Sequence, residues 1–231
     1  MTESRPNVLV FMPDRMHHAV GPNGMCVTPN FDDLASSGVN FTRGFTPTPI
    51  CTPARASTMT GLMPHRHRLL HNSHMSYPHQ GDLPEGLDTF ADLLSAAGYD
   101  TFYSGKWHVG CEEGPEDHGF HEVHGEPGSP EPEELRDPVR IPNEHRIKNL
   151  LAGTTDQDPE ELAPWKICGS AADFIRRQSR QGGEKPFCAF VSTRAPHVPW
   201  YAPEQYVQHY DPADIERWPN FDDDLADKPV T

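Results

Sequence analysis

The sequence lacks a long hydrophobic run, and basic residues are scarce in it. Its longest purely aliphatic or aromatic stretch near the start covers residues 8–12. A secretory signal needs a core of ~7–15 apolar residues and a membrane span needs ~20. We therefore expect no export signal and no transmembrane segment, and we expect a cytoplasmic protein.

The charge is strongly acidic. Lys and Arg number 19 against 34 Asp and Glu, which gives a formal net charge of −15. Nucleic acids and anionic membrane surfaces attract proteins through clustered basic residues. Neither is expected as a partner of this chain.

Cysteine pairs of the Cys-x-x-Cys type are also missing. The five cysteines are Cys26, Cys51, Cys111, Cys168 and Cys188. Their odd number and wide spacing, without an export signal, favour free thiols in a reducing compartment. A chain of 231 residues is long enough to bury a sizeable core, as one large domain or two small ones.

Apolar runs alternate with stretches of helical spacing along most of the chain. The predicted strands cover residues 8–12, 39–45, 99–104 and 187–192, and the predicted helices cover residues 31–37, 53–60, 89–97 and 171–180. The continuous apolar run at residues 8–12 is typical of a parallel strand buried on both faces. The alternation predicts an α/β fold with a mostly parallel sheet sandwiched by helices.

Two regions depart from this alternation. Residues 111–164 are rich in Pro, Glu and His and show little periodicity, which predicts a loop-rich, functional excursion. Beyond Pro196 the chain is rich in Pro and Asp, and no strand is predicted there.

Polar side chains follow each of the four predicted strands. They are Asp14, the segment 51–55, Lys106 with His108, and His197. Taken singly, Asp14 reads equally well as a turn residue and Cys51 as an inert thiol. In the same way, Lys106 reads as a surface lysine and His197 as a loop histidine. Because ligands of open α/β sheets bind at the carboxyl ends of the strands, four such clusters together predict a site.

The segment 51–55 has the pattern Cys-x-Pro-x-Arg, which a chain of this size matches by chance with a probability on the order of 1%. Pro53 suits the first turn of a helix, whose positive N-terminal end suits an anion. Arg55 lies one turn further along and can act as a second anion clamp.

These motifs, together with others in fixed order, carry a family resemblance. The further segments are residues 5–14, 28–35, 60–61, 97–101, 105–110, 119–120 and 196–199. The chain resembles the N-terminal part of the catalytic domain of formylglycine-dependent sulfatases, in the alkaline-phosphatase-like superfamily. The resemblance implies an alkaline-phosphatase-like α/β fold and a domain, residues 1–231, that is the N-terminal portion of that catalytic domain.

The resemblance also implies a chemistry for each site residue. A maturation enzyme would oxidise Cys51 to formylglycine, whose hydrate is the nucleophile. A divalent metal, usually calcium, would lie at Asp14 and residue 51 and act as Lewis acid and template. Arg55 would stabilise the hydrate or the charge of the metal site, and Lys106 would bind sulfate oxygens. His108 would take a proton from the hydrate, and His197 would bind sulfate or protonate the leaving group.

Two positions depart from the family pattern. Arg15 stands where many members have a second aspartate. The Asp-His-Gly-like segment that supplies the remaining metal ligands of the family has no counterpart after His197. We therefore expect a chain truncated at its C-terminus, as a fragment of a longer sulfatase or as a degenerate product.

Histidines recur between the motifs, at positions 65, 67, 71, 74 and 79. Their irregular spacing fits no common zinc pattern, and lining of a cleft or exposure at the surface is favoured over a second metal site. His71 and Asn72 are candidates for substrate contact.

Three functions remain open from the sequence. The first is hydrolysis of an organic sulfate monoester, arylsulfatase-like, with a small-molecule or carbohydrate substrate. The second is hydrolysis of a phosphonate monoester or phosphodiester by the same nucleophile. The third is a truncated, non-catalytic sulfatase-like fragment.

Overall fold

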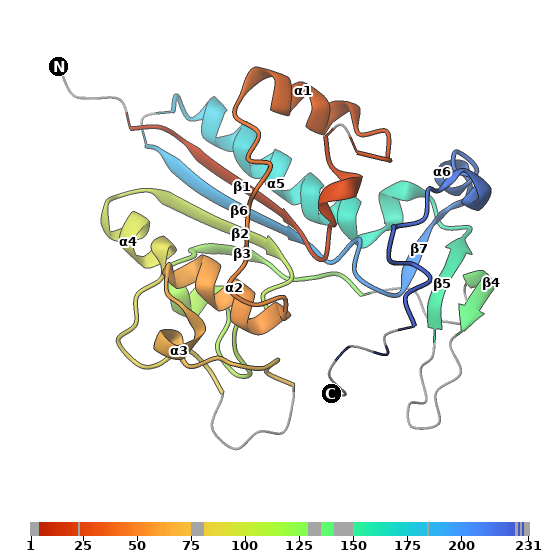
Figure 1. Ribbon diagram of the computed structural model, residues 1–231. Coiled ribbons are helices and arrows are strands. Elements are labelled where there is room, and N and C mark those ends of the chain that lie inside the picture. Colours follow the sequence, from red (N-terminus) through yellow and green to blue (C-terminus); the bar gives the residue numbers. More distant parts are fainter. Residues whose placement is uncertain are drawn as a thin grey trace.

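The main sheet contains four parallel strands. The computed structural model describes residues 5–22, 24–74, 81–128, 135–140, 150–183, 185–224, 226 and 228. Strands β1 (Val8–Pro13), β2 (Asp100–Gly105), β3 (Glu122–His124) and β6 (Phe187–Thr193) pair in the order β1-β6-β2-β3 (Figure 1). All three pairings are parallel, so the predicted α/β fold with a mostly parallel sheet is confirmed.

Helices cover both faces of this sheet (Figure 1). The helices near it are α1 (Pro29–Ser37), α2 (Cys51–Thr60), α3 (Pro64–His67), α4 (Phe90–Ala96) and α5 (Ala163–Arg180), whereas α6 (Glu204–Val207) lies apart from them, beyond the main sheet. Short 3₁₀ turns lie at η1 (His18–Val20), η2 (Pro115–His118), η4 (Pro159–Glu161) and η5 (Pro212–Asp214). Among the described residues, none of the helices combines the length and the apolar character that a membrane crossing requires.

Alternate residues of the two central strands feed two separate cores. Phe102 of β2 packs in one cluster with Ile167 and Phe174 of α5. Its neighbour Tyr103 packs in the other cluster with Phe190, on the face covered by α2 and α4. Successive side chains of a strand point to opposite faces, so strands buried on both faces are apolar throughout.

Local signals in the sequence account for two helix ends. Gly61 follows α2 in a left-handed conformation (φ 69°), which a glycine adopts without steric cost. Thr89 accepts a hydrogen bond from the amide of Asp92, and the Asp92 carboxylate accepts one from the amide of Thr89, which forms a capping box at α4. Both helices lie within two residues of their predicted bounds.

Other expectations were wrong. Residues 39–45 form no strand, and Phe41 and Phe45 are 82% and 90% exposed. β1 is not buried on both faces: it is an edge strand in the described sheet, and Leu9 and Phe11 are 55% and 43% exposed. α5 begins at Ala163, eight residues earlier than predicted, because Pro164 initiates it and Gly169 is tolerated within it.

A second sheet was missed altogether. Strands β4 (Leu135–Arg140), β5 (Leu150–Thr155) and β7 (Trp200–Pro203) pair in the order β4-β5-β7, antiparallel and then parallel. β4 and β5 lie in the segment expected to be loop-rich, and β7 follows Pro196. β4 is exposed after its first residue, β5 contains Gly153 and two threonines, and β7 has four residues, so these strands lack the apolar alternation that marks a strand in sequence.

Candidate active site

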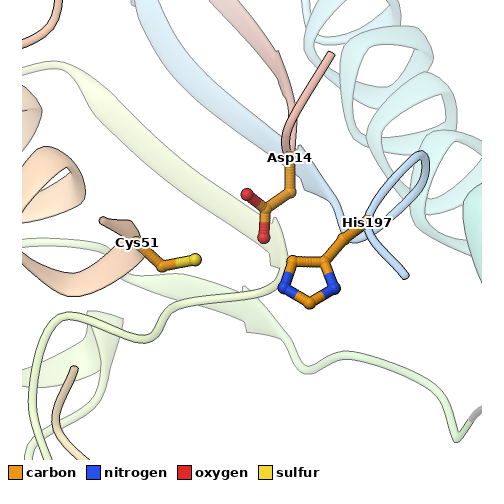
Figure 2. Close-up of side chains that lie close together, drawn as sticks. All are labelled: Asp14, Cys51 and His197. Atoms are coloured by element: carbon orange, nitrogen blue, oxygen red, sulfur yellow. The ribbon is translucent and has the colours of Figure 1, made fainter. Parts of the chain in front are cut away.

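The carboxyl ends of three parallel strands bring the predicted residues together. The amide of Asp14, after β1, donates to the Thr193 carbonyl (3.0 Å), and that of Lys106, after β2, donates to the Ser192 carbonyl (2.9 Å). His197 lies in the loop after β6. Figure 2 shows the Asp14 carboxylate, the Cys51 thiol and the His197 ring pointing toward one another. A cavity of about 870 Å³ at this edge is lined by Cys51, Lys106, His108 and His197, among others.

Asp14 is the centre of a buried ion cluster. The Lys106 ammonium contacts its carboxylate, and the Arg55 guanidinium lies 3.6 Å from the same oxygen. Burial alone raises the pKa of Asp14, but the hydrogen bond from Lys106 and the charges of Arg55 and Lys106 outweigh it, so the net pKa is lowered. Asp14 is therefore ionised and its charge is neutralised by two cations.

Arg55 is held by β2 and β6 from the far side of the cluster. One nitrogen of its guanidinium donates to the Lys106 carbonyl (2.7 Å) and to the Ser192 hydroxyl (2.8 Å). The second nitrogen is buried and lies 3.6 Å from the Asp14 carboxylate, so its charge is compensated although it makes no hydrogen bond among the described residues.

Gly105 determines where the Lys106 side chain lies. Its φ is 97°, and a Cβ there would lie 2.0 Å from the Ser192 carbonyl oxygen. The two strands approach so closely that only glycine fits. The Tyr103 hydroxyl donates to the Lys106 carbonyl (2.5 Å) and so holds the backbone directly after Gly105.

Cys51 is the first residue of α2, and the loop after α3 holds it in place. The amide of Thr52 donates to the Asn72 side chain (3.1 Å), and the amide of Ser73 donates to the Thr52 hydroxyl (3.1 Å). The Thr52 amide is thus engaged and Pro53 has no N–H group, so the first turn of α2 offers an anion fewer amides than most helix starts, in addition to the helix dipole. Asn72 lines the cavity, with its oxygen already engaged, whereas His71 is exposed and does not line it.

His108 has an unusual backbone and an unusual pKa. Its φ is 55°, a left-handed conformation that is strained for a residue other than glycine. Its ring stacks on His74 with 5.5 Å between centroids, and nitrogens of the two rings lie 3.3 Å apart. Burial, with the charges of Lys106 and His74, lowers the pKa of His108 to about 4. The ring is neutral at pH 7.

His197 is oriented by its own loop. Its Nδ1 lies 2.6 Å from the Val198 carbonyl, which can only accept, so Nδ1 carries the proton and Nε2 is the free nitrogen. Burial lowers the pKa of His197, and the charges of Lys106 and Arg15 lower it further, although the Val198 hydrogen bond opposes them.

Comparison with known proteins identifies this arrangement. The family model for Sulfatase matches residues 6–222. The chain belongs to the sulfatase family. It is a sulfatase domain whose fold places the motif residues at one edge of a parallel sheet.

Individual relatives are distant and longer. Arylsulfatase A of Bos taurus is 29% identical over 89% of this chain and 44% of the relative. N-acetylgalactosamine-6-sulfatase of Canis lupus familiaris is 29% identical over 87% of the chain and 42% of the relative. The crystal structure of a phosphonate monoester hydrolase of Agrobacterium radiobacter is 27% identical with a TM-score of 0.68, over 93% of this chain and 45% of that one. The chain thus spans about half the length of the relatives it matches.

The cavity and the loop beside it contain residues that the sequence did not reveal. Asp82 accepts hydrogen bonds from the amides of Cys111, Glu112 and Glu113 (2.8, 3.0 and 3.0 Å) and so fixes the loop after Lys106. No motif marks Asp82. Arg194 also lines the cavity and directly precedes the Ala-Pro-His-Val-Pro segment, which is the only sequence signal for it.

The histidine-rich segment divides into different environments. His74 lines the cavity, whereas His67 is fully buried with a ring nitrogen 3.0 Å from the Ser57 hydroxyl. His65 is exposed, and His79 lies outside the described residues. In the described part of the chain, no group of metal-ligating side chains forms in this segment.

One group of side chains in the described ranges has the geometry for a metal ion. Ligand atoms of Asp14, Cys51 and His197 lie within 4.8 Å of one another. Calcium takes about six to eight oxygen ligands, and this group supplies a single carboxylate, which Lys106 and Arg55 already neutralise. The described residues therefore do not by themselves fit calcium, and they suit an anion better.

Proposed function

We propose that this sulfatase domain hydrolyses an organic sulfate monoester, arylsulfatase-like, after a maturation enzyme has converted Cys51 to formylglycine. The observation that supports it best is the meeting of Cys51, Lys106, His108 and His197 in one cavity. In the overall reaction, water cleaves the ester S–O bond, and an alcohol or phenol and a sulfate ion leave. We infer further that residues 1–231 are the N-terminal portion of the catalytic domain.

Positive charge on this edge of the sheet binds the sulfate group. Lys106 and Arg55 are buried cations within reach of one carboxylate, so an incoming sulfate gains their attraction in a site of low dielectric.

Two neutral histidines then move protons. One hydroxyl of the formylglycine hydrate attacks sulfur and loses its proton to water, and the ester S–O bond breaks as the alcohol or phenol leaves. His108, whose pKa is about 4, is unprotonated at neutral pH and accepts the proton of the second hydroxyl, so that the carbonyl re-forms and sulfate is expelled; water then adds to the aldehyde and restores the hydrate. A bound sulfate adds negative charge beside His197, which favours protonation at Nε2 and donation to the leaving oxygen.

The metal enters the proposal only as a ligand assignment. Asp14, with residue 51, is the part of a calcium site that the described residues can supply, and the other oxygen ligands must come from elsewhere. A metal there would act as a Lewis acid toward a sulfate oxygen. No step above depends on it.

A phosphonate monoester is the second candidate substrate. It is supported by the likeness to the phosphonate monoester hydrolase, whose sequence identity to this chain (27%) is close to that of arylsulfatase A (29%). Both substrates present tetrahedral anionic oxygens to the same cations. The remaining alternative is a non-catalytic fragment.

The test is co-expression of the chain with a formylglycine-generating enzyme, followed by peptide mass analysis and hydrolysis assays. Conversion lowers the mass of the peptide containing Cys51 by about 18 Da. We expect hydrolysis of 4-nitrophenyl sulfate above that of a phenyl phosphonate monoester, with no hydrolysis by the Cys51→Ala control. The reverse preference would support the phosphonate reading, and an unmodified, inactive thiol the non-catalytic one.

A further inference from the structure

A second cavity adjoins the first. It measures about 390 Å³ and lies between the second sheet, the start of α5 and the loop after β6. Glu126, Arg194 and His197 line both cavities, so the two adjoin at these side chains. Nothing in the proposed reaction uses the second cavity.

Its wall is apolar. Apart from the three shared residues, no charged side chain among the described residues lines it, and its remaining polar side-chain groups are the Tyr201 hydroxyl and the Trp200 indole N–H. Small side chains, among them Ala152 opposite Trp200 in the β5–β7 register, leave the volume open. The Trp200 indole N–H donates to the Pro196 carbonyl (2.6 Å), which holds the ring against the loop that carries His197.

The junction between the cavities carries no net charge. Arg194 and Glu126 form a two-point ion pair, with N···O distances of 2.5 and 2.9 Å. The hydrogen bond and charge of Glu126 raise the pKa of Arg194, so the pair stays ionised and mutually neutralised. A neutral organic group bound at this junction therefore does not have to desolvate an unpaired charge.

We propose that the second cavity binds the organic group of the sulfate ester and selects a flat aromatic group over a sugar. This rests on the proposed function, because it requires the sulfate group at Lys106 and the ester oxygen at His197. The organic group then extends past His197 toward Trp200 and Tyr201.

The chemistry of the wall decides the preference. An aromatic ring gains apolar burial and ring contacts with Trp200 and Tyr201. A sugar ring would bring several hydroxyl groups to a wall with one side-chain hydroxyl, and each hydroxyl buried without a partner costs free energy.

The test measures binding to the Cys51→Ala chain, which cannot turn substrate over, by titration calorimetry. The probes are inorganic sulfate, 2-naphthyl sulfate, 2-naphthol and glucose 6-sulfate. We expect 2-naphthyl sulfate to bind about tenfold more tightly than inorganic sulfate, and glucose 6-sulfate no more tightly than inorganic sulfate.

Two tryptophan variants locate the effect. Trp200→Ala should remove the advantage of 2-naphthyl sulfate and leave the affinity for inorganic sulfate unchanged. The matched control is Trp165→Ala, on α5, since Trp165 is as exposed as Trp200 (54% against 47%) and lines neither cavity. A third variant, Ala152→Leu, fills the cavity without removing a contact and should also weaken 2-naphthyl sulfate.

The outcomes separate the two proposals. Equal affinities for inorganic sulfate and 2-naphthyl sulfate, or equal effects of the two tryptophan variants, would overturn the aromatic subsite while the sulfate site stands. Binding of 2-naphthol that depends on Trp200, without binding of inorganic sulfate, would contradict the proposed function and support the apolar cavity. If no probe binds, both fail.

Discussion

Replacement of Arg55 tests the buried ion cluster most directly. Arg55→Met keeps a side chain of similar length and removes the guanidinium. Asp14 would then retain Lys106 as its one cationic partner, and the Ser192 hydroxyl would lose its donor. The Lys106 carbonyl would still accept from Tyr103.

The size of the effect follows from burial. Arg55 and Asp14 are 3% and 9% exposed at their side chains; because Lys106 still compensates Asp14, the loss is that of charged hydrogen bonds in a buried site, about 1.5–3 kcal/mol of unfolding free energy. For a chain of this length, 1 kcal/mol lowers Tm by about 2–4 °C, which predicts a fall of about 3–12 °C.

The matched control is Arg177→Met. Arg177 makes two contacts with Glu122 (2.5 and 2.7 Å), but it is 47% exposed at its side chain, and exposed pairs contribute about 0–1 kcal/mol. Urea titration and thermal melts followed by circular dichroism give both quantities. Equal losses in the two variants, or a loss below about 1 kcal/mol for Arg55→Met, would refute the assignment of Arg55 and Asp14 to a buried pair.

Further predictions concern the same edge of the sheet. Gly105→Ala should lower the unfolding free energy by more than about 3 kcal/mol, because the added Cβ would meet the Ser192 carbonyl oxygen. Gly169→Ala, in open space on α5, should instead raise the unfolding free energy by about 0.5–1 kcal/mol. Urea titration measures both changes, and equal effects of the two variants would refute the reasoning. His108 has a folded pKa of about 4 against 6.5, so the unfolded chain binds more protons between these values and stability falls as pH drops from 6.5 to 4. The loss should be about 3 kcal/mol greater than in His108→Gln, and parallel stability curves for the two proteins would contradict it. Asn72→Ala should lower the unfolding free energy by about 1 kcal/mol, because the Thr52 amide loses its acceptor. Urea titration measures this loss, and an unchanged unfolding free energy would mean that water replaces the Asn72 oxygen.

Local patterns were sufficient for the fold class. The apolar runs at β2 and β6, together with the run at the edge strand β1 and the helices between them, predict a parallel sheet, because central strands of such a sheet are apolar on both faces. Gly61 and Thr89 marked helix ends because caps are made within a few residues.

Pairing between distant segments was not readable in the same way. Residues 39–45 have the composition of a strand, but they pair with no strand in the part of the chain that the structure describes. β5 and β7 are weak strands in sequence and pair because the chain brings residues 150–155 beside Trp200. Strand formation depends on a partner, and a sequence without an alignment does not name it.

The sequence by itself determined the family of this domain and predicted the residues that meet at its candidate site. The motifs named Asp14, Lys106 and His197, because strand ends of a parallel sheet converge wherever the strands form, and they named Cys51 through the family pattern. Only the tertiary structure decided how they are used: Arg55 is tied to the sheet, and an aromatic cavity opens beside His197. Both depend on contacts between segments tens of residues apart, which local propensity does not encode.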